Sequence, residues 1–366
     1  MSIPLDRLYH YIKSIAEEAC EDNIIIYHFW PHGSKNINNL VELRDSQVSN
    51  SEYPRVICHD QEPLDFEYYS QFDGNVQPRK LGSHLAKLGN FYNQVILIHS
   101  ERRSTDVDQY QQHCFIPAYY WSHAVIARDW FRYARYVDQK KNIERRFLVY
   151  NRAWSGTREY RLGFADTLIR LGLVDHTLMR VSPIDTSLDK HYDLHHFKHP
   201  HWRPHNVLEH YFPMCNAESH YSADFDITDY ESTDIEVVLE TLFDDLRLHL
   251  TEKTLRPIAM GQPFILAATY GSLAYLRSYG FKTFSDCWDE SYDMMSDSIE
   301  RMNKITDVMS NITSMPPSKR DAMVKQAREI AVYNKQHFFS AAFQNQIVIE
   351  LKNNLKIAYA QLTPKS

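Results

Sequence analysis

The stretch that decides the fold is Asp234–Asp293, DIEVVLETLFDDLRLHLTEKTLRPIAMGQPFILAATYGSLAYLRSYGFKTFSDCWDESYD. Two apolar runs of strand length, Ile235–Leu239 and Phe264–Ala268, lie on either side of a helix-like segment. Thr251 is typical of a helix N-cap, and Gly261 is typical of the residue that ends a helix. A strand, a helix, a second strand and a further helix in this order predict parallel α/β units.

Polar residues stand where such a sheet binds ligands. Ligands lie beyond the carboxyl ends of parallel strands, beside helix N-termini. Glu240 closes the first strand, and Thr251, Glu252 and Lys253 open the helix. A carboxylate beside a lysine suits a nucleotide, because the acid can accept ribose hydroxyls while the ammonium binds phosphate. The alternative is a solvated helix end that carries a surface ion pair.

The run LTEKTLRPIAMGQPFI, Leu250–Ile265, resembles the donor-binding segment of fucosyltransferase-like glycosyltransferases. The chain is closer still to phage-encoded glycosyltransferases, which share TEKT, PI, PFI and LRxxGFKTF in the order found here. The likeness is strong over roughly residues 235–295. It is weaker across HDQEP (His59–Pro63), YYWSHAVIARDW (Tyr119–Trp130) and YNRAWSGTREYR (Tyr150–Arg161).

This resemblance implies the α/β GT-B architecture, with two facing Rossmann-like domains. An acceptor domain is expected over residues 1–142 and a nucleotide-sugar domain over 143–340. A last helix, within 341–366, is expected to cross back to the first domain. The resemblance also implies that Glu252 contacts the donor ribose and that Lys253 binds its diphosphate.

Composition argues against phosphate binding by a glycine-rich loop and against a membrane span. The 366 residues carry a net charge of −7 and only 10 glycines, with no glycine-rich phosphate loop, so side chains must neutralise any diphosphate. The five cysteines form no CxxC pair, which suits a reducing cytosol. No apolar run approaches the ~20 residues of a membrane span. We therefore expect a cytoplasmic protein, in the host cytoplasm if it is phage-encoded, with no membrane partner.

HDQEP follows an expected strand of the first domain. An inverting glycosyl transfer needs a base that deprotonates the acceptor hydroxyl, and Asp60 and Glu62 are the candidates. Glu101, after a neighbouring strand, is a weaker one. The alternative is that the acid at the strand end only caps a helix.

NRAWSGTREYR places arginines around a strand-to-helix turn in the second domain. Arg152 and Arg158 are expected to clamp the donor diphosphate, since arginine binds phosphate bidentately. Charge on a helix surface is the alternative, more so for Arg161. With Lys253, these groups would stabilise the leaving nucleotide without a metal. The expected co-substrate is a UDP- or GDP-linked sugar, and no other cofactor is expected.

Two patterns raise the possibility of a metal. The tract from His191 to His205 contains six histidines, but its prolines favour a structural or acceptor-facing loop. Asp224 and Asp226 match a DxD pattern, which is common by chance in an Asp-rich chain. No metal site is therefore expected.

The sequence leaves the identity of the acceptor open. Residues 128–161 hold ten Lys and Arg against four Asp and Glu, whereas residues 221–250 hold nine acids and one arginine. With the phage likeness, this favours 5-hydroxymethylcytosine in double-stranded DNA, whose base would have to be flipped out. The expected phosphate contacts are Arg128, Arg132, Arg135, Lys140, Lys141, Arg145 and Arg146, the first three on one helix face. The alternatives are a glycan or lipid-linked acceptor and, from another class, a non-catalytic nucleic-acid-binding protein.

Overall fold

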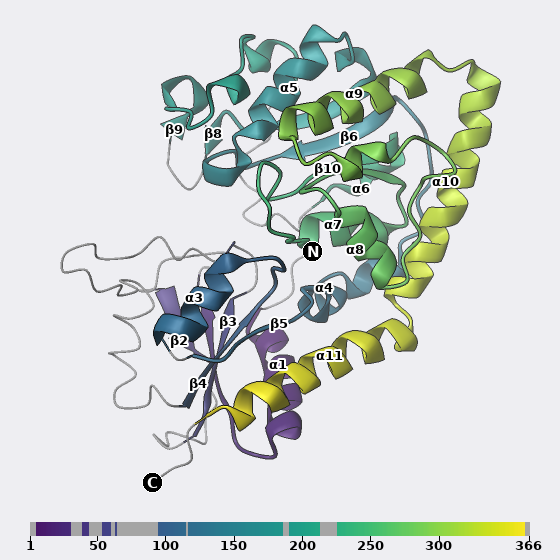
Figure 1. The fold of residues 1–366 in the computed structure, drawn as a ribbon. Helices are drawn as coiled ribbons and strands as arrows, with labels where there is room; N and C mark the ends of the chain where they lie inside the picture. The colour runs from purple at the N-terminus through teal and green to yellow at the C-terminus, as the bar shows by residue number, and fades with distance from the viewer. Residues whose placement is uncertain are drawn as a thin grey trace. The chain divides into compact units, whose positions relative to one another are not determined.

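The computed structural model describes residues 5–30, 39–43, 53–59, 63, 94–114, 116–185, 190–212 and 225–362. The chain divides into two compact units (Figure 1). The first unit contains residues 3–130 and 344–366, and the second unit contains residues 131–343. No helix within the described ranges is long and apolar enough to cross a membrane.

The first unit contains a five-stranded sheet in the order β2-β1-β3-β4-β5. Four strands are parallel, and β2 pairs antiparallel with β1 at the edge. The strands are β1 Ile25–Phe29, β2 Leu40–Glu42, β3 Arg55–His59, β4 Val95–His99 and β5 Ala118–Tyr120. The helices are α1 Leu5–Cys20, α3 Thr105–Cys114, α4 Ala124–Trp130 and α11 Ala341–Ala360.

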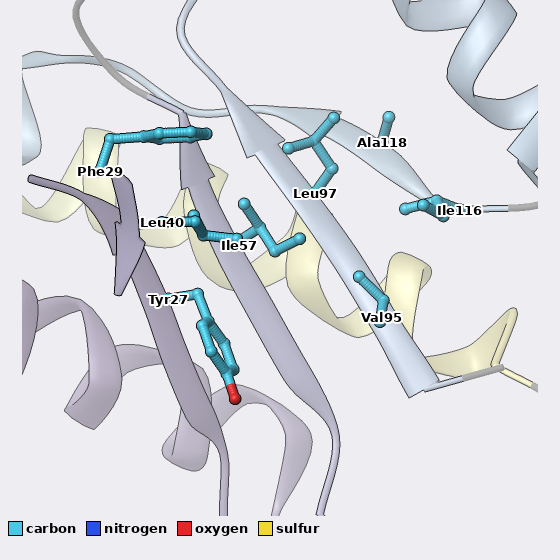
Figure 2. Close-up of a cluster of buried hydrophobic side chains, with 8 residues drawn as sticks. All are labelled: Tyr27, Phe29, Leu40, Ile57, Val95, Leu97, Ile116 and Ala118. Atoms are coloured by element: carbon cyan, nitrogen blue, oxygen red, sulfur yellow. The ribbon is translucent and has the colours of Figure 1, made fainter. Parts of the chain in front are cut away.

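A hydrophobic cluster covers one face of this sheet (Figure 2). Alternate residues of a strand point to opposite faces, so the members from β1 and those from β4 are two positions apart. Its members are Tyr27, Phe29, Leu40, Ile57, Val95, Leu97, Ile116 and Ala118. Val107 of α3 packs against it. On the opposite face, Tyr9 of α1 stacks on His28 of β1 with 4.1 Å between ring centroids.

The last helix belongs to the first unit. Asn354 Nδ2 of α11 donates to the Tyr120 carbonyl at 2.6 Å, and Tyr359 Oη donates to Asp22 Oδ2 at 2.9 Å. Glu350 accepts from Arg102 at 2.6 Å. The helix is therefore fastened both to the end of β5 and to the segment after α1.

The second unit contains a four-stranded parallel sheet in the order β11-β10-β6-β7. The strands are β6 Arg145–Asn151, β7 Thr177–Val181, β10 Thr233–Leu239 and β11 Phe264–Ala267. The principal helices are α5 Tyr160–Arg170, α6 Ile227–Glu231, α7 Glu252–Met260, α8 Ser272–Ser278, α9 Ser298–Ser314 and α10 Pro317–Phe338. A small hairpin pairs β8 Ile184–Asp185 with β9 Lys190–His191. The expected α/β class with two Rossmann-like units is confirmed, because one sheet is parallel and the other is parallel except for its edge strand β2.

One expected element is wrong. The one helix expected to carry Arg128, Arg132 and Arg135 ends as α4 at Trp130, and a 3-10 helix follows at Arg132–Tyr136. Phe131, which separates the two segments, has φ −89° and ψ 12°, outside the α-helical region. Trp130, Phe131 and Ala134 are all buried, and the boundary between the two units falls between Trp130 and Phe131. Burial of these apolar residues therefore sets the local conformation in place of helical periodicity.

Candidate functional site

The strand order of the second unit reverses between β6 and β10. From β6 the chain moves to β7 on one side, and it later returns to β10 and β11 on the other side. In open parallel sheets, ligands bind beyond the carboxyl ends of the strands at this switch point. The candidate site is therefore formed by the loop after β6, the loop after β10 and the start of α7.

Glu240, expected among the donor contacts, instead holds the start of α7. Its Oε1 accepts bonds from Thr251 N (2.9 Å), Thr254 N (3.2 Å) and Thr254 Oγ1 (2.6 Å). Its Oε2 accepts from Thr251 Oγ1 (2.9 Å) and Thr241 N (3.1 Å). A carboxylate offers about four acceptor positions, so Glu240 is saturated. In this structure Glu240 therefore holds the start of α7, and the donor contact expected for it stays a prediction.

Thr251 is the N-cap of α7, as the sequence predicts, and Gly261 ends the helix in the left-handed conformation with φ 72°. The Thr251 hydroxyl accepts from Lys253 N at 3.4 Å while donating to Glu240. Both roles of the hydroxyl are occupied and the residue is fully buried, so Thr251 holds the start of α7 in this structure, and its donor contact stays a prediction.

Glu252 and Lys253 form a buried ion pair. Lys253 Nζ lies 2.6 Å from Glu252 Oε1 and 3.2 Å from Thr251 Oγ1. The Glu252 side chain is 0% exposed and that of Lys253 is 12% exposed. The solvated helix end considered as the alternative is therefore wrong. Burying a charge is costly unless it is paired, so this pair is built into the fold.

The first turn of α5 fastens the strand ends of the site together. The Arg161 guanidinium is buried and donates to the carbonyls of Ala153 (2.6 Å), Leu239 (2.8 Å) and Glu240 (3.0 Å). Tyr160 Oη donates to the Glu240 carbonyl at 2.6 Å. The surface charge considered for Arg161 is wrong, because the side chain bridges the ends of β6 and β10. This structural role of Arg161 could not be predicted from the sequence, because the carbonyls that it binds come together only in the folded chain.

The backbone amides of the loop after β6 already have a partner. Trp154 N and Ser155 N both donate to Asp185 Oδ2, at 2.9 and 2.8 Å. A carboxylate therefore occupies the position where a phosphate could have met these amides. Side chains must neutralise a bound diphosphate, as the scarcity of glycine predicts.

Charged groups of both signs act on Lys253. Burial is the largest cause that lowers the pKa of Lys253, and Arg161 and Arg158 lower it further, whereas Glu252 and Glu240 raise it. Arg158 ends a 3-10 turn, Gly156–Arg158, and is half-buried, as is Arg152. The structure therefore places Arg158 within electrostatic reach of Lys253.

The expected catalytic residues Asp60 and Glu62 lie outside the described residues. Their neighbour His59 ends β3, beside β4 in the parallel register. Glu101, the weaker candidate, is 2% exposed and lines a cavity of about 360 Å³ with His99, Arg102, Tyr120 and Glu350. This cavity lies at the carboxyl ends of β4 and β5, the ligand-binding side of a parallel sheet.

The expected DNA contacts are divided between the two units. Arg128 lies on α4 in the first unit, whereas Arg132 and Arg135 lie on the 3-10 helix of the second unit. They therefore do not share a helix face. Arg132 lies over the Tyr133 ring at 4.6 Å, and Arg135 is exposed.

Two of the four expected linker contacts are occupied within the second unit. Lys141 Nζ donates to the Tyr230 carbonyl (2.7 Å), the Thr233 carbonyl (3.1 Å) and Gln262 Oε1 (2.5 Å), and burial lowers its pKa to about 7. Arg146 pairs with Asp234 at 2.6 Å. Both side chains are therefore engaged within their own unit, and a phosphate role for either stays a prediction. Lys140 and Arg145 are exposed.

The sequence patterns considered for metals have different outcomes. Asp226 is the N-cap of α6 and accepts from Thr228 N at 2.9 Å, while Asp224 lies outside the described residues. His191, paired by spacing with His195, instead contacts Glu209 at 2.9 Å, and His195 contacts Glu159 at 2.8 Å. These two histidines therefore have separate carboxylate partners.

No protein-family model matches the chain, and no curated protein sequence matches it. Among solved structures, α,α-trehalose 6-phosphate synthase from Burkholderia multivorans aligns over 100% of this chain and 79% of its own. The two are 13% identical, with a TM-score of 0.37. Such a low score does not support an argument, so the fold assignment rests on the strand order and registers given above.

Proposed function

We propose that the protein is a glycosyltransferase whose second unit binds the diphosphate of a nucleotide sugar at the switch point of its sheet. The observation that carries this proposal is the buried pair of Lys253 and Glu252, 2.6 Å apart at the start of α7, on which Arg158 acts as a further cation. Lys253 and Arg158 would neutralise a diphosphate and would stabilise the charge that develops on the leaving nucleotide.

The Glu252–Lys253 pair would exchange partners on donor binding. Lys253 would move from Glu252 Oε1, now 2.6 Å away, to a phosphate oxygen. The Glu252 carboxylate would then accept ribose hydroxyls, which replace the hydrogen bond from the ammonium. This exchange accounts for a buried pair at the position that the family resemblance assigns to the donor.

The first unit would supply the acceptor site. Asp60 or Glu62 would deprotonate the acceptor hydroxyl in an inverting transfer, with Glu101 as the described alternative at a neighbouring strand end. We propose 5-hydroxymethylcytosine in double-stranded DNA as the acceptor, on the basis of the phage likeness. A glycan or lipid-linked acceptor is the second candidate, and non-catalytic nucleic-acid binding is the third.

Transfer to DNA is tested directly. The protein is first screened by thermal unfolding with UDP-, GDP- and CMP-sugars, because a ligand at about 100 times its Kd adds about 2.7 kcal/mol of stability. The stabilising donor is then incubated with duplex DNA that contains 5-hydroxymethylcytosine, and the digested nucleosides are weighed by mass spectrometry. We expect the mass of one hexose or pentose to be added to 5-hydroxymethyl-2′-deoxycytidine.

Duplexes that contain unmodified cytosine, together with a panel of glycan acceptors, serve as controls. Transfer to a glycan but not to the modified DNA would replace the DNA acceptor with the second candidate. Stabilisation by no nucleotide sugar, together with tight DNA binding, would favour the non-catalytic class and contradict the transferase proposal.

Activity is expected to survive chelation. If Lys253 and Arg158 neutralise the leaving diphosphate, a divalent metal has no required role there. Initial rates are compared after dialysis against EDTA and after addition of Mg²⁺ or Mn²⁺. An activity that chelation abolishes and Mn²⁺ restores would contradict the metal-independent proposal and return attention to Asp224 and Asp226.

A further inference from the structure

We propose that His199, His201 and Asp244 bind one divalent transition-metal ion, with Zn²⁺ the best match, independently of the sugar-transfer function. One ligand atom from each of the three residues can be chosen so that all lie within 4.8 Å of one another. No other group of three His, Cys, Asp or Glu residues in the described ranges meets this condition. Asp244 is 45 positions from His199 in the chain, so the fold, and not local sequence, brings the three together.

The geometry needs only side-chain movement to close around an ion. His201 Nε2 lies 3.9 Å from Asp244 Oδ2. Bonds of about 2.0–2.1 Å in a tetrahedral arrangement place ligand atoms about 3.3 Å apart. The side chains of His201 and Asp244 are 38% and 34% exposed, which leaves them room to rotate inward and leaves the ion accessible to water.

The backbone that carries the histidines is held in place. Glu159 is buried, and its two carboxylate oxygens accept from Lys198 N at 2.9 Å and His199 N at 3.1 Å. Pro200 stands between the two histidines and restricts their backbone. A metal would therefore meet a histidine pair whose position is already fixed, which lowers the ordering cost of binding.

Asp244 is oriented by a neighbour of the histidines. Trp202 Nε1 donates to Asp244 Oδ2 at 3.4 Å, and the buried Trp202 ring packs edge-on against Phe243 with 6.1 Å between centroids. Hydrogen bonds of this kind orient metal-ligating carboxylates. The tryptophan thus connects the histidine loop to the loop after β10, and an ion would add a second connection between them.

The ligand chemistry decides the class of ion. Two imidazoles and one carboxylate suit Zn²⁺ and similar transition metals, whereas Mg²⁺ and Ca²⁺ prefer oxygen ligands alone. Three protein ligands leave a fourth position for water. Because the loop after β10 also leads into α7, the ion is expected to stabilise the second unit.

The experiment uses tag-free, full-length protein stripped with EDTA and then dialysed. Zn²⁺ is titrated by calorimetry, and thermal unfolding is recorded with and without the metal. We expect one equivalent of Zn²⁺ to bind and to raise the Tm, with no comparable shift from Mg²⁺. His201→Ala and Asp244→Asn are each expected to raise the Kd for Zn²⁺ more than about tenfold.

His196→Ala is the matched control, because His196 is an exposed histidine of the same tract outside the cluster. It should bind Zn²⁺ as the wild type does. Circular dichroism of the metal-free variants shows whether each has folded, and Asp244→Asn provides a second variant if His201→Ala does not. Absence of stoichiometric Zn²⁺ binding, or binding that both ligand variants retain, would overturn the proposal.

Discussion

Replacing Arg256 by methionine is expected to lower the free energy of unfolding by about 3–5 kcal/mol, because a buried carboxylate would lose its cation. Arg256 Nη2 lies 2.6 Å from Glu236 Oε1, and the side chains are 4% and 0% exposed. Burial alone would lower the pKa of Arg256, but Glu236 and the hydroxyls of Tyr230 and Tyr150 raise it overall. The guanidinium therefore stays charged and is stabilised by this cluster.

Further contacts of the cluster explain why the loss should be large. Arg256 Nε donates to Tyr230 Oη at 3.1 Å, and Tyr230 Oη donates to Glu236 Oε2 at 2.5 Å. The guanidinium also lies over the Tyr150 ring at 4.5 Å. Methionine keeps the apolar stem but supplies none of these hydrogen bonds. The buried Glu236 carboxylate would then lose its bond from Arg256 and keep only the one from Tyr230.

Urea unfolding followed by circular dichroism measures the effect. Arg277→Met is the matched control: Arg277 pairs with Glu290 at 3.4 Å, its own side chain is 46% exposed, and the 7% exposed Glu290 keeps a hydrogen bond from Phe284 N at 2.7 Å. A pair open to solvent on the arginine side contributes less than a fully buried pair, so this variant should lose much less stability than Arg256→Met. A double variant, Arg256→Met with Glu236→Leu, should recover part of the loss, since it removes both charges. Equal midpoints for Arg256→Met and Arg277→Met would contradict the buried-cluster account.

Replacing Lys253 by methionine is expected to weaken binding of the nucleoside diphosphate by roughly 10- to 150-fold, which corresponds to the loss of about 1.5–3 kcal/mol of charged hydrogen bonding. Binding of the corresponding nucleoside, which lacks phosphate, should change much less. Lys282→Met is the matched control, because Lys282 lies over the Tyr333 ring at 4.3 Å and outside the candidate site. Calorimetry with both ligands measures the difference.

The exchange of partners predicts a different result for Glu252→Gln. An amide binds ribose hydroxyls less well than a carboxylate, so affinity for the nucleoside should fall together with that for the diphosphate. If Glu252→Gln affects only the diphosphate, the glutamate acts solely by holding Lys253. Wild-type affinities in both Lys253→Met and Glu252→Gln would remove the donor site from this position.

The pH dependence gives an independent test of Lys253. Burial lowers its pKa in the free protein, whereas a bound diphosphate would favour the charged ammonium and raise it again. Between these two pKa values, binding takes up a proton, and affinity falls as the pH rises above the pKa of the free protein. The Lys253→Met variant should lose this contribution, so a decline of the same size in wild type and variant would assign it to another group.

Local signals in the sequence predict the elements of the second unit well. Thr251 and Gly261 predict the two ends of α7 correctly, because the effects of an N-cap and of a terminal glycine are local to the helix that they bound. The apolar run that begins at Phe264 predicts β11, because a strand that is buried on both faces carries a nearly continuous run of apolar residues. The strand β7, Thr177–Val181, was missed, since its alternating burial includes the polar side chains of Thr177 and Arg180.

Partners that are distant in the chain explain what the sequence does not reveal about the site. From the sequence alone, Glu240 is a plausible ligand contact, but in the structure Thr251 and Thr254 donate to its carboxylate. Glu252 likewise reads as a surface residue, but its side chain is buried. The role of Arg161 depends on carbonyls about 80 residues away. Such groups have the same chemistry as ligand-binding residues, so only their three-dimensional contacts separate the two roles.

The return of α11 to the first unit has a consequence for synthesis on the ribosome. Residues 131–343 are made between the two parts of the first unit, and at about 5–20 residues per second they require roughly 10–40 s. During this time β5 and the segment after α1 lack the contacts that Asn354 and Tyr359 later provide. The second unit can therefore fold while the nascent chain still grows, whereas the first unit is complete only after its last helix has been made. A chaperone would act mainly in this interval, on the incomplete first unit.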